Sequence, residues 1–125
     1  MKGNFKVGLG ILVGFDFGAV VVEQLHAQPP AYVISEIDVT NADAYAKEYV
    51  PLANKALAES GQKRLVSGGK TISFAGDPPA ARIVVSIFES MEKAQAAYTS
   101  PAYIEARKVG DKYGKLRIFA VEGIQ

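Results

Sequence analysis

The sequence contains no cysteine and only one histidine, His26. The lack of cysteine excludes disulfide bonds, thiolate nucleophiles, iron–sulfur clusters and zinc sites with cysteine ligands. Because His26 lies near the N-terminus, removal of an N-terminal leader would leave a domain without any imidazole. Catalytic triads, histidine acid–base catalysis and histidine-ligated metals would then be absent too. We therefore expect neither a metal nor a cofactor.

The sequence also lacks an excess of charge of either sign. It has 14 basic and 13 acidic residues, a formal net charge of +1, and no long block of one sign. Since nucleic-acid-binding domains usually carry a basic face, we expect no nucleic-acid partner. Hydrophobic residues make up 49% of the 125 residues, which is typical of one packed domain rather than of a disordered chain.

Residues 1–27 have the layout of a secretory signal peptide. Two lysines precede a largely apolar run, Val7–Val22, and Ala27 supplies a small residue at a cleavage point. Asp16 interrupts the apolar run, so an uncleaved N-terminal anchor and an ordinary amphipathic helix stay open as alternatives. The signal-peptide interpretation predicts a domain over residues 28–125 in the periplasm or outside the cell. Contact with a membrane would occur only through an uncleaved leader.

The rest of the chain alternates between strand and helix patterns. We expect strands over 31–39, 63–67, 70–75, 82–88 and 115–121, with 70–75 as a second strand or the other arm of a hairpin. We expect helices over 45–57, divided or kinked at Pro51, and over 91–113, restarted at Ser100-Pro101. This order predicts an α+β fold, a ferredoxin-like β-α-β-β-α-β protomer with an antiparallel sheet and both helices on one face.

The sheet face away from the helices should also carry apolar residues. On this face we expect Ile34 among the polar residues of the first strand, and Val84 and Phe88 beside Arg82. An apolar face of this kind usually needs a second cover, and a twofold copy of the same sheet is the simplest one. The sequence therefore predicts a homodimer that forms a dimeric α/β barrel.

Four stretches of the sequence together resemble a known family. They are PPAYVISEIDVTNADAYAKEYVPLA, SGGKTISFAG, RIVVSIFESMEKAQAAYTSPAYIEAR and FAVEG. The chain resembles the domain of unknown function 1330 family, a member of the dimeric α/β-barrel group, over nearly all of residues 29–123. The resemblance implies the ferredoxin-like protomer and the dimer but no reaction. The wider group includes cofactor-independent monooxygenases, isomerases and haem enzymes, and the haem relatives usually depend on an axial histidine.

Two charged side chains, Glu36 and Arg82, lie on strands that the topology makes neighbours. We expect both on the interior face of the dimeric barrel. Such a pair can orient a small polar ligand, or Glu36 can act as a base while Arg82 or a tyrosine stabilises an enolate. A structural ion pair at the interface is the simpler alternative.

Three other side chains are candidate ligand contacts. Tyr49 and Tyr103, on the predicted helices, can donate phenolic hydrogen bonds into a cleft between helix and sheet, or can simply pack in the core. Arg64, with the turn Ser67-Gly68-Gly69, can hold a carboxylate or a phosphate, and a plain hairpin turn is the alternative.

Three functions are compatible with these residues. The first is an exported homodimer that binds a small organic ligand in the barrel or in the helix–sheet cleft. The second is a cofactor-independent enzyme of monooxygenase or isomerase type in the same pocket. The third is a structural or accessory interaction protein without a ligand.

Overall fold

The computed structural model describes residues 28–125, so the predicted leader over residues 1–27 lies outside the described residues. The elements, in chain order, are β1 (Ala31–Val39), α2 (Ala42–Ala44), the π-helical turn η4 (Tyr45–Tyr49), α3 (Val50–Leu57), β2 (Lys63–Ser67), β3 (Arg82–Phe88), α4 (Met91–Tyr98), α5 (Pro101–Tyr113) and β4 (Gly114–Glu122). This β-α-β-β-α-α-β order confirms the predicted ferredoxin-like α+β protomer.

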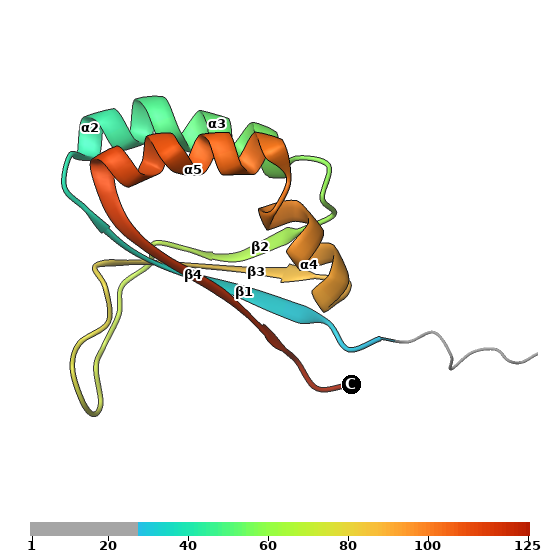
Figure 1. The fold of residues 1–125 in the computed structure, drawn as a ribbon. Coiled ribbons are helices and arrows are strands. Elements are labelled where there is room, and N and C mark those ends of the chain that lie inside the picture. Colours follow the sequence, from blue (N-terminus) through green and yellow to red (C-terminus); the bar gives the residue numbers. More distant parts are fainter. Residues whose placement is uncertain (1–27) are drawn as a thin grey trace, which may run out of the picture.

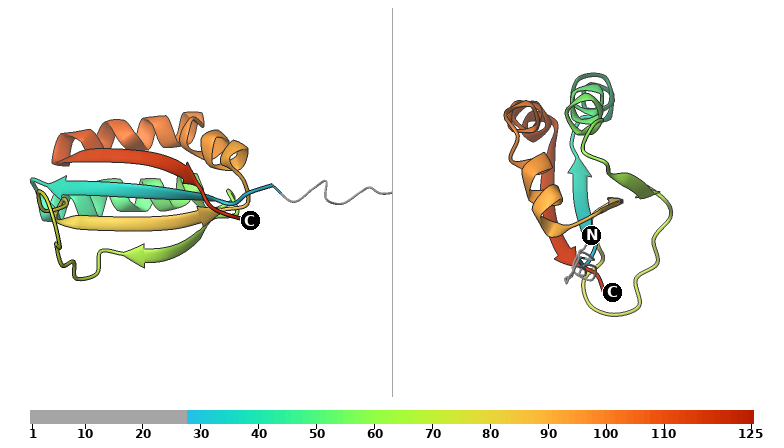
Figure 2. Two further views of the ribbon diagram at one scale, coloured as in Figure 1. Left: turned by 90° about the horizontal axis from the view of Figure 1, so that it is seen from below. Right: turned by 90° about the vertical axis from the view of Figure 1, so that its right-hand side faces the viewer.

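The four strands form one antiparallel sheet in the order β2-β3-β1-β4. The helices lie together on one side of it (Figure 1), and the view from the opposite side looks directly onto the strands (Figure 2). The two sides of the sheet therefore have different surroundings, and we name them the covered face and the open face.

Within residues 28–125 no helix is both long enough and apolar enough to cross a membrane.

The covered face, under the helices, holds the core. Along β1 its residues alternate, and Val33, Ser35 and Ile37 point toward the helices and are buried. The buried core residues are Ala31, Val33, Ile37, Tyr45, Tyr49, Ala53, Leu57, Phe88, Ala94, Ala97, Tyr103 and Ala106. Alanines and tyrosines outnumber the branched aliphatic residues in this set. Small side chains bring the helices close to the sheet, and the tyrosines fill the remaining space with rings that also carry hydroxyl groups.

The open face carries the larger aliphatic residues of the strands. Ile34, in the centre, pairs with Val85 on one side and Phe119 on the other. The apolar residues of the open face are Ile34, Val66, Ile83, Val85, Ile87, Phe119 and Val121. None of the helices in the described part of the chain packs on them (Figures 1 and 2). The predicted apolar second face is thus present.

The residues that β3 contributes to this face differ from the prediction. We expected Arg82, Val84 and Phe88 on the open face. Val84 pairs with Ser35, and Phe88 pairs with Ala31, so both point toward the helices. The alternation of β3 agrees with the prediction, but its two faces are exchanged, because the residues on both faces mix polar and apolar side chains and the pattern alone does not tell them apart.

Residues 70–75 do not form the predicted strand. They have no regular secondary structure and belong to a long connection between Ser67, the end of β2, and Arg82, the start of β3. The composition of this segment favours a strand, but the segment has no strand of the described chain to pair with. In Figure 1 the connection projects from the end of the sheet, away from α3 and α5.

Candidate functional site

The first helical region places Tyr45 and Tyr49 side by side above the sheet. Pro51 lies in the first turn of α3, and a proline ring clashes with the carbonyl four residues earlier in an α-helix. The chain winds more widely just before it, and the Val50 N–H donates to the Tyr45 carbonyl five residues back. This π-helical turn buries both rings, whose centroids lie 5.1 Å apart. π-Helical turns are frequent at functional sites.

The break between α4 and α5 brings two more tyrosines to the same region. Ser100 caps α5, its Oγ accepting from the Tyr103 N–H at 3.2 Å, and Pro101 occupies the first turn. Tyr98, the last residue of α4, therefore lies close to Tyr103, in the first turn of α5. Their ring centroids are 4.7 Å apart in an edge-to-face arrangement.

A hydrogen bond joins the two pairs of tyrosines. The hydroxyl oxygens of Tyr49 and Tyr103 lie 2.8 Å apart in a buried setting. Gly110 of α5 makes room for this contact, because a Cβ at that position would lie 2.7 Å from Cδ1 of Tyr49. Burial raises the pKa of Tyr98 and of Tyr103 to about 12, and burial with the neighbouring Tyr103 raises the pKa of Tyr49 further. At neutral pH these phenols keep their protons and can serve as donors.

Two arginines bring positive charge to the edge of this tyrosine cluster. Arg82 donates from Nη2 to Ser67 Oγ at 3.3 Å, and Gly68 leaves space for the guanidinium, since a Cβ there would lie 2.1 Å from Nη1. Burial raises the pKa of the Tyr45 hydroxyl, while the charge and hydrogen bonding of Arg82, and the charge of Arg64, lower it. The arginines thus favour negative charge near Tyr45.

These side chains line a cavity of about 60 Å³ between the sheet and the first helical region. Its polar lining residues are Ser35, Tyr45, Tyr49, Asn54, Arg64, Arg82, Tyr98 and Tyr103. No carboxylate or histidine of residues 28–125 is among its lining residues. Guanidinium groups and phenols offer hydrogen-bond donors, and the guanidiniums also bring positive charge. The cavity, which we call the donor cavity, therefore suits an oxygen atom that carries negative charge.

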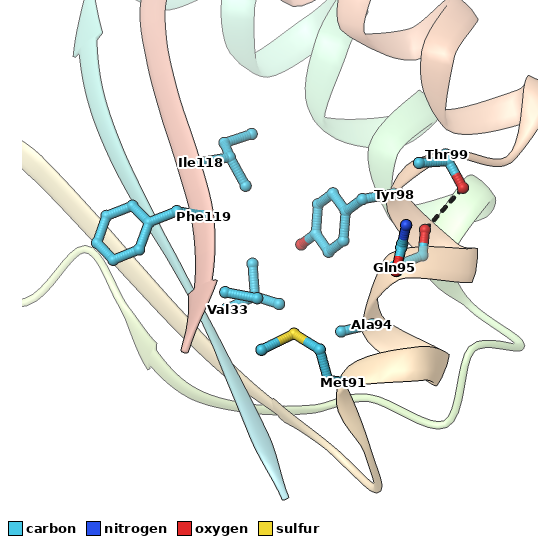
Figure 3. Close-up of a pocket in the computed structure, with 9 residues that line it drawn as sticks. Val33, Met91, Ala94, Gln95, Tyr98, Thr99, Ile118 and Phe119 are labelled. Carbon is cyan, nitrogen blue, oxygen red and sulfur yellow. Dashed lines mark hydrogen bonds between the residues drawn. The ribbon is translucent and has the colours of Figure 1, made fainter. Parts of the chain in front are cut away.

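A second cavity, of about 240 Å³, lies between α4 and strands β1 and β4. Its walls are mostly apolar, and in Figure 3 Val33, Met91 and Ile118 surround the space into which the Tyr98 ring extends. The Phe119 ring points away, toward the open face of the sheet (Figure 3). Tyr98 lines both cavities. The larger cavity alone is slightly smaller than typical small-molecule sites, which have volumes of about 300 Å³ and above.

Four of the five residues predicted as ligand contacts line the donor cavity, namely Tyr49, Arg64, Arg82 and Tyr103. They come from four different elements, which the fold brings together. Tyr45 and Tyr98 were missed as site residues. The signal that marks them is their position, since Tyr45 lies one turn before Tyr49, ahead of Pro51, and Tyr98 lies just before Ser100-Pro101.

Glu36, the fifth predicted residue, lies elsewhere. It pairs with Ile83 and Arg117 across the open face, and Arg117 Nη2 donates to its Oε2 at 2.6 Å. Arg82 pairs with Ile37, so it points to the covered face. The prediction that Glu36 and Arg82 share one face is therefore wrong, because they lie one register position apart and side chains alternate along a strand.

The described acidic residues are also scattered. Within residues 28–125 no group of three or more histidine, cysteine, aspartate or glutamate side chains lies close enough together to hold a metal ion.

Comparison with known structures identifies the fold. RPA0582 of Rhodopseudomonas palustris, a protein of unknown function, matches with a TM-score of 0.61 at 15% identity, covering 78% of this chain and 85% of that one. A proposed antibiotic biosynthesis monooxygenase of Caulobacter crescentus matches with a TM-score of 0.55 at 20% identity (82% and 97%). SnoaB of Streptomyces nogalater, a cofactor-independent oxygenase, matches with a TM-score of 0.50 at 10% identity (78% and 95%).

These likenesses confirm the fold of the dimeric α/β-barrel proteins, and at such low identity they extend to the fold alone. No curated protein matches the sequence. One family description does, over residues 30–124, and it covers all the elements of the sheet and the helices. The chain therefore belongs to the family described as domain of unknown function DUF1330.

Proposed function

We propose that this protein is a homodimer that binds a small organic anion in the helix–sheet cleft of each protomer. The acidic oxygen of the ligand lies in the donor cavity, and its apolar part extends past Tyr98 into the larger cavity. The observation that carries this proposal is the lining of the donor cavity, which combines two arginines with four tyrosines and no carboxylate of the described residues.

The charge of the cleft supports an anion rather than a neutral ligand. Arg82 lies partly buried beside Tyr45, where its charge is less screened than at the surface. No acidic side chain among the lining residues in the described range neutralises it. A carboxylate or enolate oxygen would accept bonds from the guanidinium and from the phenols, and bonds of this charge-assisted kind are stronger than neutral ones.

A thermal-shift panel tests this proposal. Small aromatic carboxylates such as benzoate should raise the melting temperature of the protein. The matched amides, which carry no negative charge, should not. At about 100 times the dissociation constant the gain is about 2.7 kcal/mol, which is about 10 °C or more for a domain of this size. Enols with a similar apolar part extend the panel.

The matched variants are Arg82→Gln and Lys108→Gln. Arg82 lines the donor cavity, whereas Lys108 pairs with Glu105 on the exposed surface of α5. Arg82→Gln should abolish the shift, and Lys108→Gln should keep it. An equal shift in both variants, or no shift of the wild type with any acid of the panel, would contradict the proposal and would favour an interaction protein without a ligand.

The proposal of a homodimer rests on the open face. Seven apolar side chains cover it, and proteins of this fold are typically dimers. Two copies related by a twofold axis would bury the same face on each copy. The barrel would then enclose the two open faces, and each donor cavity would stay within its own protomer.

A cofactor-independent oxygenase or isomerase is a second candidate, and the donor cavity itself favours it. Phenols and guanidinium groups that bind an enolate oxygen also stabilise that charge in a transition state. Glu36 cannot serve as the base, because it lies on the open face. The substrate would therefore have to be acidic enough to ionise without a carboxylate of the cavity. Oxygen uptake, or deuterium exchange at the carbon beside a carbonyl, distinguishes catalysis from binding.

We propose that the protein is located in the periplasm or outside the cell, because residues 1–27 resemble a secretory leader. Mass spectrometry of the protein purified from its own host tests it. A chain that begins at Gln28 is the expected result, and a chain that retains Met1 would argue for an anchor or an ordinary N-terminal helix.

A further inference from the structure

The connection between β2 and β3 exposes two large apolar side chains. Phe74 is 94% exposed and Ile72 is 69% exposed. The surrounding residues 70–79 are exposed as well. A single exposed apolar residue is common, but two of them in one projecting segment indicate a surface that another molecule covers.

The sequence of this segment is that of a strand. Thr71, Ile72, Ser73 and Phe74 alternate between polar and apolar and are mostly β-forming residues, which is typical of a strand with one buried side. Yet residues 69–74 pair with no strand of the described chain. The pattern thus predicts a partner strand or surface that residues 28–125 of one copy do not supply.

Hydrogen bonds fix the base of the segment, and a glycine turn lies at each end. At the base, the Gly68 N–H donates to the Ile83 carbonyl at 2.8 Å, and Arg82 donates to Ser67 Oγ. Gly68 and Gly76 adopt positive φ angles of 73° and 75°, which favour glycine, so each makes a turn that other residues rarely adopt. The segment between these turns projects from the sheet, and we define its residues 70–75 as the arm.

The position of the arm suggests what covers it. The arm projects from the sheet on the side away from α3 and α5, which is also the side of the open face (Figures 1 and 2). The arm therefore lies on the side of the sheet where the apolar residues of the open face are exposed. Charge does not oppose contact with a second copy, because the open face carries both signs, as in the pair of Glu36 and Arg117.

We propose that the arm of each protomer packs on the second copy of the chain, with Ile72 and Phe74 seated at the edge of the apolar open face of that copy. This inference rests on the proposed homodimer and adds a specific interlocking contact to it. Twofold symmetry makes the contact occur twice, so each copy gives one arm and receives one. Addition of an extended segment to an exposed sheet edge is a common mode of association.

The test compares two double variants. The arm variant, Ile72→Ala with Phe74→Ala, removes the two large apolar side chains of the arm. The helix variant, Leu52→Ala with Ile104→Ala, truncates two exposed apolar residues of α3 and α5 on the opposite side of the molecule. The dissociation constant of the dimer is measured by sedimentation over a dilution series. The arm variant should raise it at least tenfold, and the helix variant should change it less than twofold.

A second measurement follows the arm directly. Amide hydrogen exchange of residues 70–75 should be slow at concentrations where the wild type is dimeric and fast after dilution. Because the arm side chains are exposed in the protomer, the arm variant should unfold at the same temperature as the wild type when both are monomeric.

The outcomes separate the two proposals. A wild type that is dimeric, with an arm variant that dissociates no more readily than the helix variant, or with arm amides that exchange fast in the dimer, overturns the inference about the arm and leaves the dimer. A wild type that stays monomeric at every concentration overturns the dimer and the arm together.

Discussion

The covered face and the open face belong to one sheet, yet they distribute polar and apolar residues in opposite ways. The covered face, which a monomer already shields from water, contains Ser35, Ser86 and Arg82 beneath a layer of tyrosines. The open face has an isoleucine, valine or phenylalanine at most positions near its centre. A protein that folded only to be a stable monomer would be expected to place these residues the other way round.

The difference indicates two distinct tasks. A covered face that places arginine and tyrosine donors around one cavity favours a site for a polar ligand. Exposed aliphatic residues in one continuous patch favour association. The two tasks need not interfere, because side chains on alternate positions of a strand point to opposite sides.

The most disruptive change should be a charge in the centre of the open face. Ile34→Asp, on β1 between Val85 and Phe119, should convert the proposed dimer into a monomer. Loss of each buried isoleucine makes the free energy of dimer association less favourable by about 2 kcal/mol. An unpaired buried carboxylate costs several kcal/mol more. The dissociation constant should therefore rise by about a thousandfold or more. Light scattering after gel filtration measures the mass.

Leu52→Asp is the matched control, because it places the same charge on the outer side of α3, where Leu52 is exposed. It should leave the mass of the dimer unchanged. If Ile34→Asp formed a dimer as readily as the control, the open face would not be the interface.

Much of the fold could be predicted from the sequence because local signals and the overall pattern agree. Alternation defined β1 and β3, and Ser100-Pro101 defined the restart of α5. What could not be predicted is which side of β3 faces the helices. Both faces of β3 mix polar and apolar residues, and only the geometry shows that the long side chain of Arg82 reaches Ser67 and Tyr45 at the rim of the core.

The candidate site was predicted in its residue types rather than in its arrangement. Tyr49 and Tyr103 were predicted together as donors into a helix–sheet cleft, Arg64 and Arg82 were predicted for other reasons, and the fold brings all four to one cavity. Their meeting depends on long-range contacts, such as the hydrogen bond between residues 54 positions apart. A single sequence holds no signal for such a contact, so the cavity became visible only in three dimensions.

A smaller effect should follow from filling the close contact on the covered face. Gly110→Ala places a Cβ 2.7 Å from the buried Tyr49 ring, which must then shift. Overpacking of this kind costs about 1–3 kcal/mol, and the better helix propensity of alanine returns up to about 1 kcal/mol. We expect a net loss of about 1–2 kcal/mol in urea-induced unfolding. Gly69→Ala, where a Cβ meets no atom within 4 Å, should be nearly neutral. Equal stability of the two variants would mean that the tyrosines are not tightly held.

The buried tyrosines also predict a loss of stability at alkaline pH. Tyr98 and Tyr103 have pKa values raised to about 12 by burial, whereas an unfolded tyrosine ionises near pH 10. Above pH 10 the unfolded state releases these protons first, so stability falls as the pH rises toward 12, by up to about 1.4 kcal/mol per pH unit for each tyrosine. Unfolding in urea at several pH values measures the slope.

Tyr103→Phe sharpens this prediction. It should lower stability at neutral pH by about 1 kcal/mol through the lost hydrogen bond to Tyr49. The same variant should make the alkaline slope shallower, because one raised pKa is removed. Tyr113→Phe is the control and should change the slope less, because the hydrogen bond to Glu48 that raises the pKa of Tyr113 lies at the exposed surface. An unchanged slope in Tyr103→Phe would mean that this hydroxyl is hydrated in the native state.

The smallest effect should come from Glu36→Gln, which probes whether the two faces act separately. Glu36 and Arg117 form an ion pair in which Arg117 is mostly exposed, and exposed pairs contribute about 0–1 kcal/mol. Because Glu36 points to the open face, the variant should bind a carboxylate in the donor cavity with unchanged affinity, in contrast to Arg82→Gln. Any effect should instead appear as a modest change in the dissociation constant of the dimer, since the glutamine keeps the shape but loses the charge. If Glu36→Gln weakened carboxylate binding as strongly as Arg82→Gln, the ligand would have to reach both faces, and the separation between a binding face and an association face would fail.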